Sequence, residues 1–137
     1  ERLGFCQNSV SFRGHAIECR INAEDPDRNF MPSTGLITSF HVPGGYGIRV
    51  DSHVHAEYVV SPYYDSMLAK LIVWGKDRKE ALTRTQRALE EFIIEGVKTT
   101  IPFHSRMLKD PRFVDGQAHI TLVEDMLAAD QGTVAGS

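Results

Sequence analysis

The stretch His15–Asp25, HAIECRINAED, alternates between apolar and polar residues. Its apolar positions are Ile17, Cys19, Ile21 and Ala23, and its polar positions are Glu18, Arg20, Asn22 and Glu24. Successive side chains of a β-strand point to opposite faces of the sheet. The alternation therefore predicts a half-buried strand, running from about Gly14 to Ala23, with one wholly polar face.

The composition narrows the class of protein. The chain has 137 residues, of which 42% are hydrophobic and 24% charged, as in an ordinary soluble domain. Its net charge of −3 gives no reason to expect a nucleic-acid partner, because such proteins usually carry a basic excess. No apolar run approaches the roughly 20 residues that cross a bilayer, so no membrane partner is expected. Cys6 and Cys19 are too few for a disulfide framework and predict reduced thiols in a cytoplasmic protein.

Two further regions have the composition of strands. Residues 36–42 and 48–52 flank the turn Pro43-Gly44-Gly45, which predicts a hairpin because glycine supplies the positive φ values of tight turns. The run Met67–Trp74 is apolar except for Lys70, which predicts a central strand covered on both faces. Lys70 then either reaches the surface or meets a buried acid.

The hydrophobic period changes to that of helices after Gly75. Asp77 and Glu80 have the spacing of a capping box. The stripe that follows consists of Leu82, Thr85, Leu89, Phe92 and Ile93, with Gly96 expected as the stop. A second helix is predicted from Thr100, with Pro102 in its first turn and Met107 and Leu108 facing inward, and a third from Thr121 that fades by Asp130.

Strands precede helices along the chain, and this order predicts an α+β fold. We expect an antiparallel sheet built of hairpins over about residues 12–75, packed with helices over about residues 77–129. Residues 1–12 are expected to be a linker, residues 13–129 the domain, and residues 130–137 a disordered tail.

Arg20 is the strongest candidate for a functional residue. Its guanidinium stays charged at physiological pH and matches the shape of a carboxylate, bicarbonate or an enolate oxygen. Glu18 and Asn22 on the same strand face could hold it rigid, and a rigid charge is an effective electrostatic stabiliser. The alternative is a surface ladder of ion pairs, each contributing less than about 1 kcal/mol. The alternation alone leaves both readings open.

Other polar residues give weaker signals. The glycine-rich turn at 44–47 is not followed by the Lys-Ser/Thr of a phosphate-binding loop. His53 and His55 would share a strand face, but no third ligand lies at a suitable spacing, so no metal site is predicted. Asp65 either pairs with an arginine or caps the start of the buried strand.

Four segments, in this order and spacing, carry a resemblance to a known family: RGHAIECRINAEDP (13–26), FMPSTG (30–35), PGGYGIRVDS (43–52) and PYYDSMLAKLIVWG (62–75). Together with the later EGVKTTIPFH (95–104), they resemble the C-terminal domain of biotin carboxylase. The bacterial acetyl-CoA carboxylase subunit is the nearest resemblance. It covers almost the whole chain, roughly from Arg13 to Leu127.

This resemblance implies a reaction and a role for Arg20. Biotin carboxylase uses ATP and bicarbonate to form carboxyphosphate, and then carboxylates N1 of biotin on a carrier protein. In the family, the arginine of the ECRINAED strand faces the active site and helps to hold bicarbonate and the biotin ureido oxygen. That arginine matches Arg20, and Glu18, Asn22 and Glu24 are expected to support it.

The resemblance also implies an assembly. The family dimerises through this domain, which places Tyr46 and Arg49 in the interface, with Asp65 near it as an ionic partner. The expected partners are a second copy of the chain, the biotin carboxyl carrier protein and carboxyltransferase subunits. ATP and Mg²⁺ are expected to bind an ATP-grasp region upstream of Glu1, so the chain alone should bind neither and be inactive.

Two alternatives remain beside this reading. One is a non-catalytic dimerisation or docking module, in which Arg20 affects no activity. The other is the terminal domain of an ATP-grasp ligase that does not use biotin.

Overall fold

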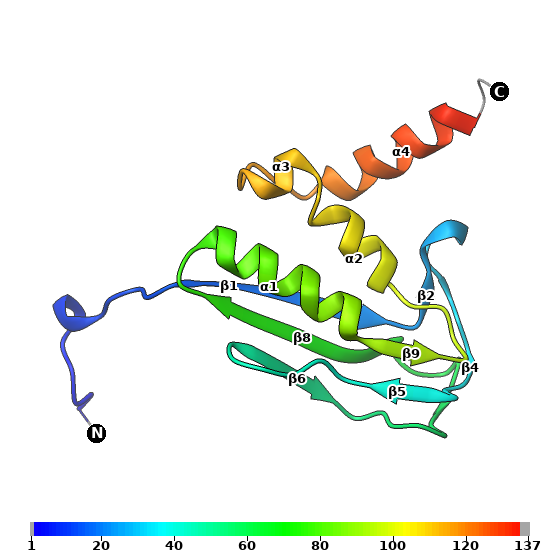
Figure 1. The fold of residues 1–137 in the computed structure, drawn as a ribbon, viewed down its shortest axis with the longest axis horizontal. Helices are drawn as coiled ribbons and strands as arrows, with labels where there is room; N and C mark the ends of the chain where they lie inside the picture. Colours follow the sequence, from blue (N-terminus) through cyan, green and yellow to red (C-terminus); the bar gives the residue numbers. More distant parts are fainter. Residues whose placement is uncertain (1, 135–137) are drawn as a thin grey trace.

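The computed structural model describes residues 2–134, with the backbone alone for residues 130–134. Residue 1 of the predicted linker and residues 135–137 of the predicted tail lie outside the described residues. The strands are β1 (His15–Asn22), β2 (Glu24–Asp25), β3 (Met31–Pro32), β4 (Gly35–Leu36), β5 (Ser39–His41), β6 (Ile48–Ser52), β7 (Val59–Val60), β8 (Met67–Gly75) and β9 (Ile93–Glu95). The α-helices are α1 (Arg78–Glu91), α2 (Ile101–Met107), α3 (Pro111–Val114) and α4 (Leu122–Val134), and short 3₁₀ turns cover Gln7–Ser9 and Pro26–Arg28. The predicted α+β class is confirmed (Figure 1).

β8 is the central strand of the main antiparallel sheet, whose order is β1-β8-β6. In this sheet Arg20 of β1 lies opposite Lys70 of β8, and Asp51 of β6 lies opposite Lys70 from the other side. The pairing of β1 with β8 shifts register between Ile21 and Asn22. The other strands form two-stranded sheets, β2-β3, β4-β7 and β5-β9.

The predicted hairpin at residues 36–52 is wrong. β5 pairs with β9 and β6 pairs with β8, so the strands that flank the turn belong to different sheets. The turn itself is present, with positive φ angles of 110° at Gly45 and 74° at Gly47. Local composition therefore located the strands and the turn, but the partners of each strand come from distant parts of the chain.

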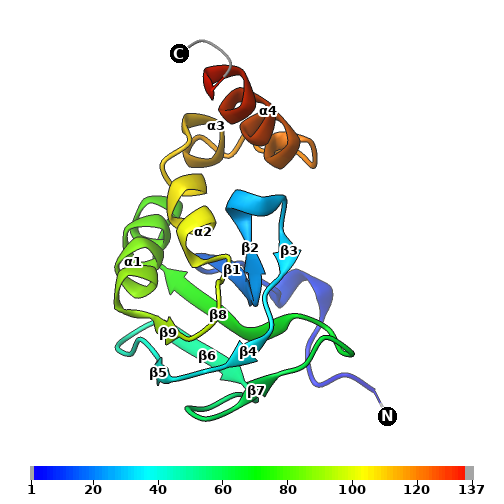
Figure 2. The same cartoon turned by 90° about the vertical axis from the view of Figure 1, so that its right-hand side faces the viewer.

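Helix α1 covers one face of the main sheet (Figures 1 and 2). The buried cluster between them consists of Ile17, Cys19, Ile21, Ala69, Leu71, Val73, Ala81, Ala88, Leu89, Phe92 and Leu108. Leu71 and Val73 have no exposed surface. On the opposite face of β8, Lys70, Ile72 and Trp74 are only half-buried, so the prediction that β8 is covered on both faces is wrong. An antiparallel sheet commonly packs one face and leaves the other to solvent.

We call this second face the open face, defined by Glu18, Arg20, Arg49, Asp51 and Lys70. Directly opposed residues of paired strands share a face, and alternate residues along one strand do so too. Burial of the odd-numbered side chains of β1 and β8 beneath α1 therefore places these five charged residues together.

The start of α1 agrees with the sequence, and its end does not. Asp77 caps the helix by accepting a 2.8 Å hydrogen bond from the Glu80 N–H. The Glu80 carboxylate accepts from the Lys76 N–H, so the capping box is not closed at Asp77. Gly96 is not the predicted stop, because α1 ends at Glu91 and the chain continues as β9. Gly96 has a φ of 96°, and a Cβ there would meet the Leu36 carbonyl.

The later helices follow the predicted order. α2 has Pro102 in its first turn, and Leu108 at its end is buried, as predicted. α4 continues to Val134, beyond the predicted end near Asp130. Residues 2–12 are exposed and extend away from the body of the domain (Figure 1).

The two free thiols should differ sharply in reactivity. Cys19 is buried, and burial together with the nearby Glu18 carboxylate raises the pKa of its thiol to about 12, whereas Cys6 is exposed. Because the thiolate is the reactive form, we expect one fast equivalent with a chromogenic disulfide reagent in the native state. Cys6→Ser should remove that fast equivalent, and denaturation should release the second. A fast reaction of Cys19 in the folded Cys6→Ser variant would contradict the buried position.

Candidate active site

Arg20 projects from the open face of β1 with 66% of its side chain exposed. Its ion pair with Glu18 is loose, with Nε 3.7 Å from Oε1, and the Glu18 side chain is 44% exposed. Exposed pairs of this kind contribute about 1 kcal/mol or less. The planar fork of Arg20 is therefore available to bind an anion.

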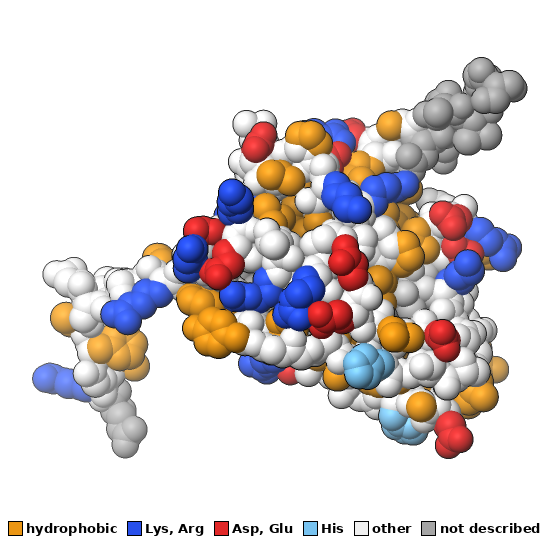
Figure 3. Space-filling model, viewed as in Figure 1, with side chains coloured by type: hydrophobic (Ala, Val, Ile, Leu, Met, Phe, Trp, Pro, Cys, Tyr) orange, Lys and Arg blue, Asp and Glu red, His pale blue; other side chains and the backbone are white. Residues whose placement is uncertain are grey.

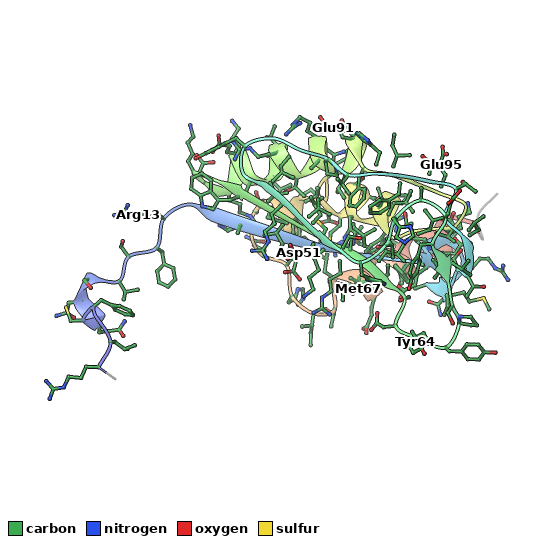
Figure 4. The ribbon with its side chains drawn as sticks, turned by 90° about the horizontal axis from the view of Figure 1, so that it is seen from below. Arg13, Asp51, Tyr64, Met67, Glu91 and Glu95 are labelled. Carbon is green, nitrogen blue, oxygen red and sulfur yellow. The ribbon has the colours of Figure 1, made fainter. Side chains whose placement is uncertain are left out.

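Lys70 and Asp51 continue a row of charges from Arg20 across the sheet. Figure 4 shows Asp51 over the middle of the sheet when the domain is seen from below. Arg49 donates two hydrogen bonds to Asp51, Nε to Oδ1 at 2.9 Å and Nη2 to Oδ2 at 2.8 Å. These bonds lower the pKa of the Asp51 carboxyl and raise the pKa of Arg49, and the Lys70 charge adds to the lowering. Lys70 thus lies beside an exposed acid. The sequence had left two alternatives for Lys70, a position at the surface or a contact with a buried acid, and neither describes this arrangement.

Of the three predicted supports, only Glu18 contacts the Arg20 side chain. Asn22 Nδ2 donates to Glu24 Oε1 at 3.2 Å, and the Ser66 hydroxyl donates to the same oxygen at 2.5 Å. Asn22 and Glu24 lie beyond the register shift that follows Ile21. Their bonds tie the end of β1 to the start of β8 and leave the guanidinium untouched.

Sequence reasoning missed two residues that hold the backbone of Arg20. The Thr100 hydroxyl donates to the Arg20 carbonyl at 3.0 Å, and His104 Nε2 lies 2.8 Å from the same oxygen. These residues follow Arg20 by 80 and 84 positions, so no local pattern connects them to it. Both lie in the EGVKTTIPFH segment, where the sequence predicted a helix start at Thr100 and carried a family resemblance but indicated no contact with Arg20.

The comparison with known proteins identifies the family. The family model described as "Biotin carboxylase C-terminal domain" matches residues 18–125, which is most of the chain. This chain belongs to the biotin carboxylase C-terminal domain family.

Curated relatives agree with this assignment. The biotin carboxylase of Nostoc sp. is 52% identical over 126 residues, which cover 92% of this chain and 28% of the relative. A pyruvate carboxylase subunit of Methanothermobacter thermautotrophicus is 54% identical over 125 residues, covering 91% of this chain and 26% of the relative. The chain therefore spans little more than a quarter of the length of these relatives.

A solved structure with the same fold is the biotin carboxylase domain dimer of Hydrogenobacter thermophilus 2-oxoglutarate carboxylase, in complex with MgADP, ADP and bicarbonate. The TM-score is 0.87 at 48% identity, covering 91% of this chain and 28% of that chain. That protein binds bicarbonate as a dimer, two properties that the resemblance had implied for the family.

Two of the residues that the biotin carboxylase resemblance places at an interface lie near one end of β8. Tyr46 is 77% exposed. Its ring meets the Trp74 ring edge-on, with centroids 6.1 Å apart, and the Arg84 guanidinium lies 5.4 Å from its centroid. Arg49 lies on β6, paired with Asp51.

Asp65 lies at the other end of β8. Its Oδ1 accepts a 2.7 Å hydrogen bond from the Met67 N–H, so Asp65 caps the start of the strand. Figure 4 shows Met67 and Tyr64 at this end of the domain. Tyr46 and Asp65 therefore mark opposite ends of the same strand.

Other surfaces fit the chemistry of a biotin carboxylase active site less well. On the α1 side, Arg84 pairs with Glu80 and Arg87 pairs with Glu91, and Figure 3 shows basic and acidic side chains interspersed there. A hollow of about 890 Å³ lies elsewhere, and its charged lining consists of Asp25, Asp27, Lys98 and Arg106. Its acids and bases balance, and Arg20 does not line it, so it gives no preference for an anion.

The two histidines considered for a metal lie after β6 and not on a strand. Their rings flank Tyr58, with centroid distances of 5.4 Å for His53 and 5.9 Å for His55. Within the described part of the chain, no three potential metal ligands of the His, Cys, Asp and Glu types come together. No helix in the same part has the length and apolar character needed to cross a membrane.

His104 should make the stability of the domain depend on pH. Burial lowers its pKa below the ordinary 6.5, and the bond to the Arg20 carbonyl offsets this only in part. On acidification the unfolded chain therefore takes up the proton first. We expect the free energy of unfolding in urea to fall as the pH drops below 6.5, and the loss to level off below the lowered pKa of the folded state.

The matched control is another histidine. His104→Gln should flatten this part of the pH profile, whereas His119→Gln, at an exposed position, should leave it unchanged. Equal effects of the two substitutions would contradict the partly buried position of His104.

Proposed function

We propose that this chain is the part of a biotin carboxylase that supplies Arg20 to the active site. The proposal rests on one observation above all: a largely exposed guanidinium stands on a strand whose backbone is held from both sides. When N1 of biotin loses its proton, negative charge grows on the ureido oxygen. A positive charge already fixed in place stabilises that oxygen without reorganisation.

Bicarbonate is the other anion that Arg20 would hold. The two unprotonated oxygens of bicarbonate match the parallel N–H groups of a guanidinium, as those of a carboxylate do. The bicarbonate bound to the Hydrogenobacter relative supports an anion of this kind as a ligand in the family. Lys70, beside Arg20 on the open face, raises the local positive potential.

The remaining parts of the reaction belong to other components. ATP and Mg²⁺ would be bound by an ATP-grasp region, and biotin would arrive on the biotin carboxyl carrier protein. We assign the complete enzyme to a cytoplasmic acetyl-CoA carboxylase of fatty-acid synthesis, whose further partners would be carboxyltransferase subunits. Relatives named simply biotin carboxylase support this choice. Other relatives are subunits of pyruvate carboxylase and 2-oxoglutarate carboxylase, and these two enzymes are the competing assignments.

Tyr46, Arg49 and Asp65 are proposed to form the dimer surface. The Trp74 ring and the Arg84 guanidinium restrict the exposed Tyr46 ring, and a rigid exposed aromatic is an effective interface anchor. The dimeric Hydrogenobacter relative supports this assembly.

Arg20→Ala is the direct test of the function. In a longer protein that joins this chain to an ATP-grasp region, we expect carboxylation of free biotin to fall on the order of 100-fold or more, because a preorganised donor is lost. The melting temperature and the KM for ATP should stay unchanged. The assay follows bicarbonate-dependent ATP cleavage and carboxybiotin formation together.

Arg87→Ala is the matched control, since Arg87 is also an exposed arginine paired with a glutamate. It should retain full activity. If Arg20→Ala also carboxylates biotin at the parent rate, the arginine has only a structural role, and the task of the domain is assembly.

The dimer surface has its own test. Tyr46→Ala and Arg49→Glu should each raise the dissociation constant of the dimer by roughly tenfold or more, a loss of about 1.4 kcal/mol of binding. Sedimentation equilibrium of the longer protein measures this constant. Arg28→Glu, at an exposed position outside the proposed surface, should leave it unchanged. An equal weakening by all three substitutions would refute the assignment.

A further inference from the structure

We propose that Thr100 and His104 are positioning residues that set the place of Arg20 from behind, through its backbone carbonyl. This inference rests on the proposed function, because it concerns how the anion-binding guanidinium is held. The hydrogen bonds of both side chains go to the main chain of β1 and not to the charged groups of the open face.

The strand needs such support because of its place in the sheet. Within the described part of the chain, β1 is an edge strand, which pairs with β8 on one side and with no strand on the other. The ladder to β8 also changes register between Ile21 and Asn22, one residue beyond Arg20. A register shift leaves a backbone group unpaired and lets the strand bend locally. The functional arginine therefore stands where the sheet itself holds the chain least firmly.

Thr100, the residue before α2, replaces the missing strand on the outer side. Its backbone N–H donates to the Asn22 carbonyl at 3.1 Å. Its hydroxyl accepts from the Asn22 N–H at 3.0 Å and donates to the Arg20 carbonyl at 3.0 Å. Thr100 is 5% exposed, so water competes little for these bonds. One residue thus bonds three successive peptide groups that span the register shift.

His104 adds a second donor one helical turn later. Residues four apart lie on the same face of a helix, which brings the ring beside Thr100. The Arg20 carbonyl has no hydrogen to give, so the bond of 2.8 Å requires a proton on His104 Nε2. Together the hydroxyl and the ring occupy both lone pairs of that carbonyl oxygen.

The helix that carries this pair is anchored in two hydrophobic clusters. Leu108 at its end joins the cluster beneath the main sheet, and Phe103 joins a second cluster with Leu122 and Met126. Figure 2 shows α2 beside β1 and β2. Thr100 and His104 therefore fix the Arg20 backbone relative to these hydrophobic clusters, while the guanidinium remains exposed.

Two pairs of substitutions in the longer protein test this. Thr100→Val keeps the shape of the side chain and removes the hydroxyl, whereas Thr100→Ser keeps the hydroxyl. His104→Leu removes the ring donor, whereas the amide of His104→Gln can still donate. Thr83→Val is the control, because the Thr83 hydroxyl donates to the Lys79 carbonyl on the exposed side of α1.

We expect Thr100→Val and His104→Leu to lower kcat for biotin carboxylation on the order of 10- to 100-fold, since small displacements of a reacting group have effects of this size. The KM for ATP should not change. Thr100→Ser and His104→Gln should restore most of the rate, and Thr83→Val should have no effect. In an Arg20→Ala background, Thr100→Val should cause no further loss, because the residue it positions is gone.

The outcomes separate this inference from the proposed function. Full activity of both Thr100→Val and His104→Leu, with Arg20→Ala impaired, overturns the positioning role alone. An equal further loss in the Arg20→Ala background also overturns it, because the pair then acts on the fold. Full activity of Arg20→Ala overturns the proposed function itself. If Thr100→Val does not fold, His104→Leu tests the positioning role instead, alone and combined with Arg20→Ala. The Thr100 hydrogen bonds to β1 remain in both of these variants.

Discussion

The buried side chains of Leu71 and Val73 lie between the main sheet and α1, and the position of every residue on the open face depends on this contact. Because side chains alternate along a strand, burying these two turns Lys70 outward. The register then carries Arg20 and Asp51 to the same face. A slip of one residue would move the guanidinium into the core, so the hydrophobic cluster also determines where the charge stands.

The structure combines a firmly held backbone with a free side chain at Arg20. On one side β8 pairs with β1, and on the other side Thr100 and His104 bond the Arg20 carbonyl. Among the described residues, the guanidinium itself makes one loose ion pair, with Glu18. An anion can replace that contact at little cost, while the backbone resists displacement. Such an arrangement suits electrostatic catalysis, which needs charges that do not reorganise during the reaction.

The sequence predicted the features that depend on local pattern. Alternation located β1 and the exposure of Arg20, and Asp77 located the start of α1. It missed the open face of β8, because Ile72 and Trp74 are apolar although half-exposed. It also missed the pairing of β5 with β9, and the bonds from α2 to β1, because those partners are distant along the chain. The role of Arg20 in binding an anion came from family resemblance, since the alternation on its own favoured a salt-bridge ladder.

The most direct test of the central claim is a crystal structure of the longer protein with bicarbonate bound, and then with biotin. Anion binding by a firmly held Arg20 predicts that both N–H groups of one edge of its guanidinium lie within about 2.7–3.2 Å of an oxygen of the ligand. It also predicts that Thr100 and His104 still bond the Arg20 carbonyl. A bound anion held by other residues, with Arg20 still beside Glu18, would contradict it.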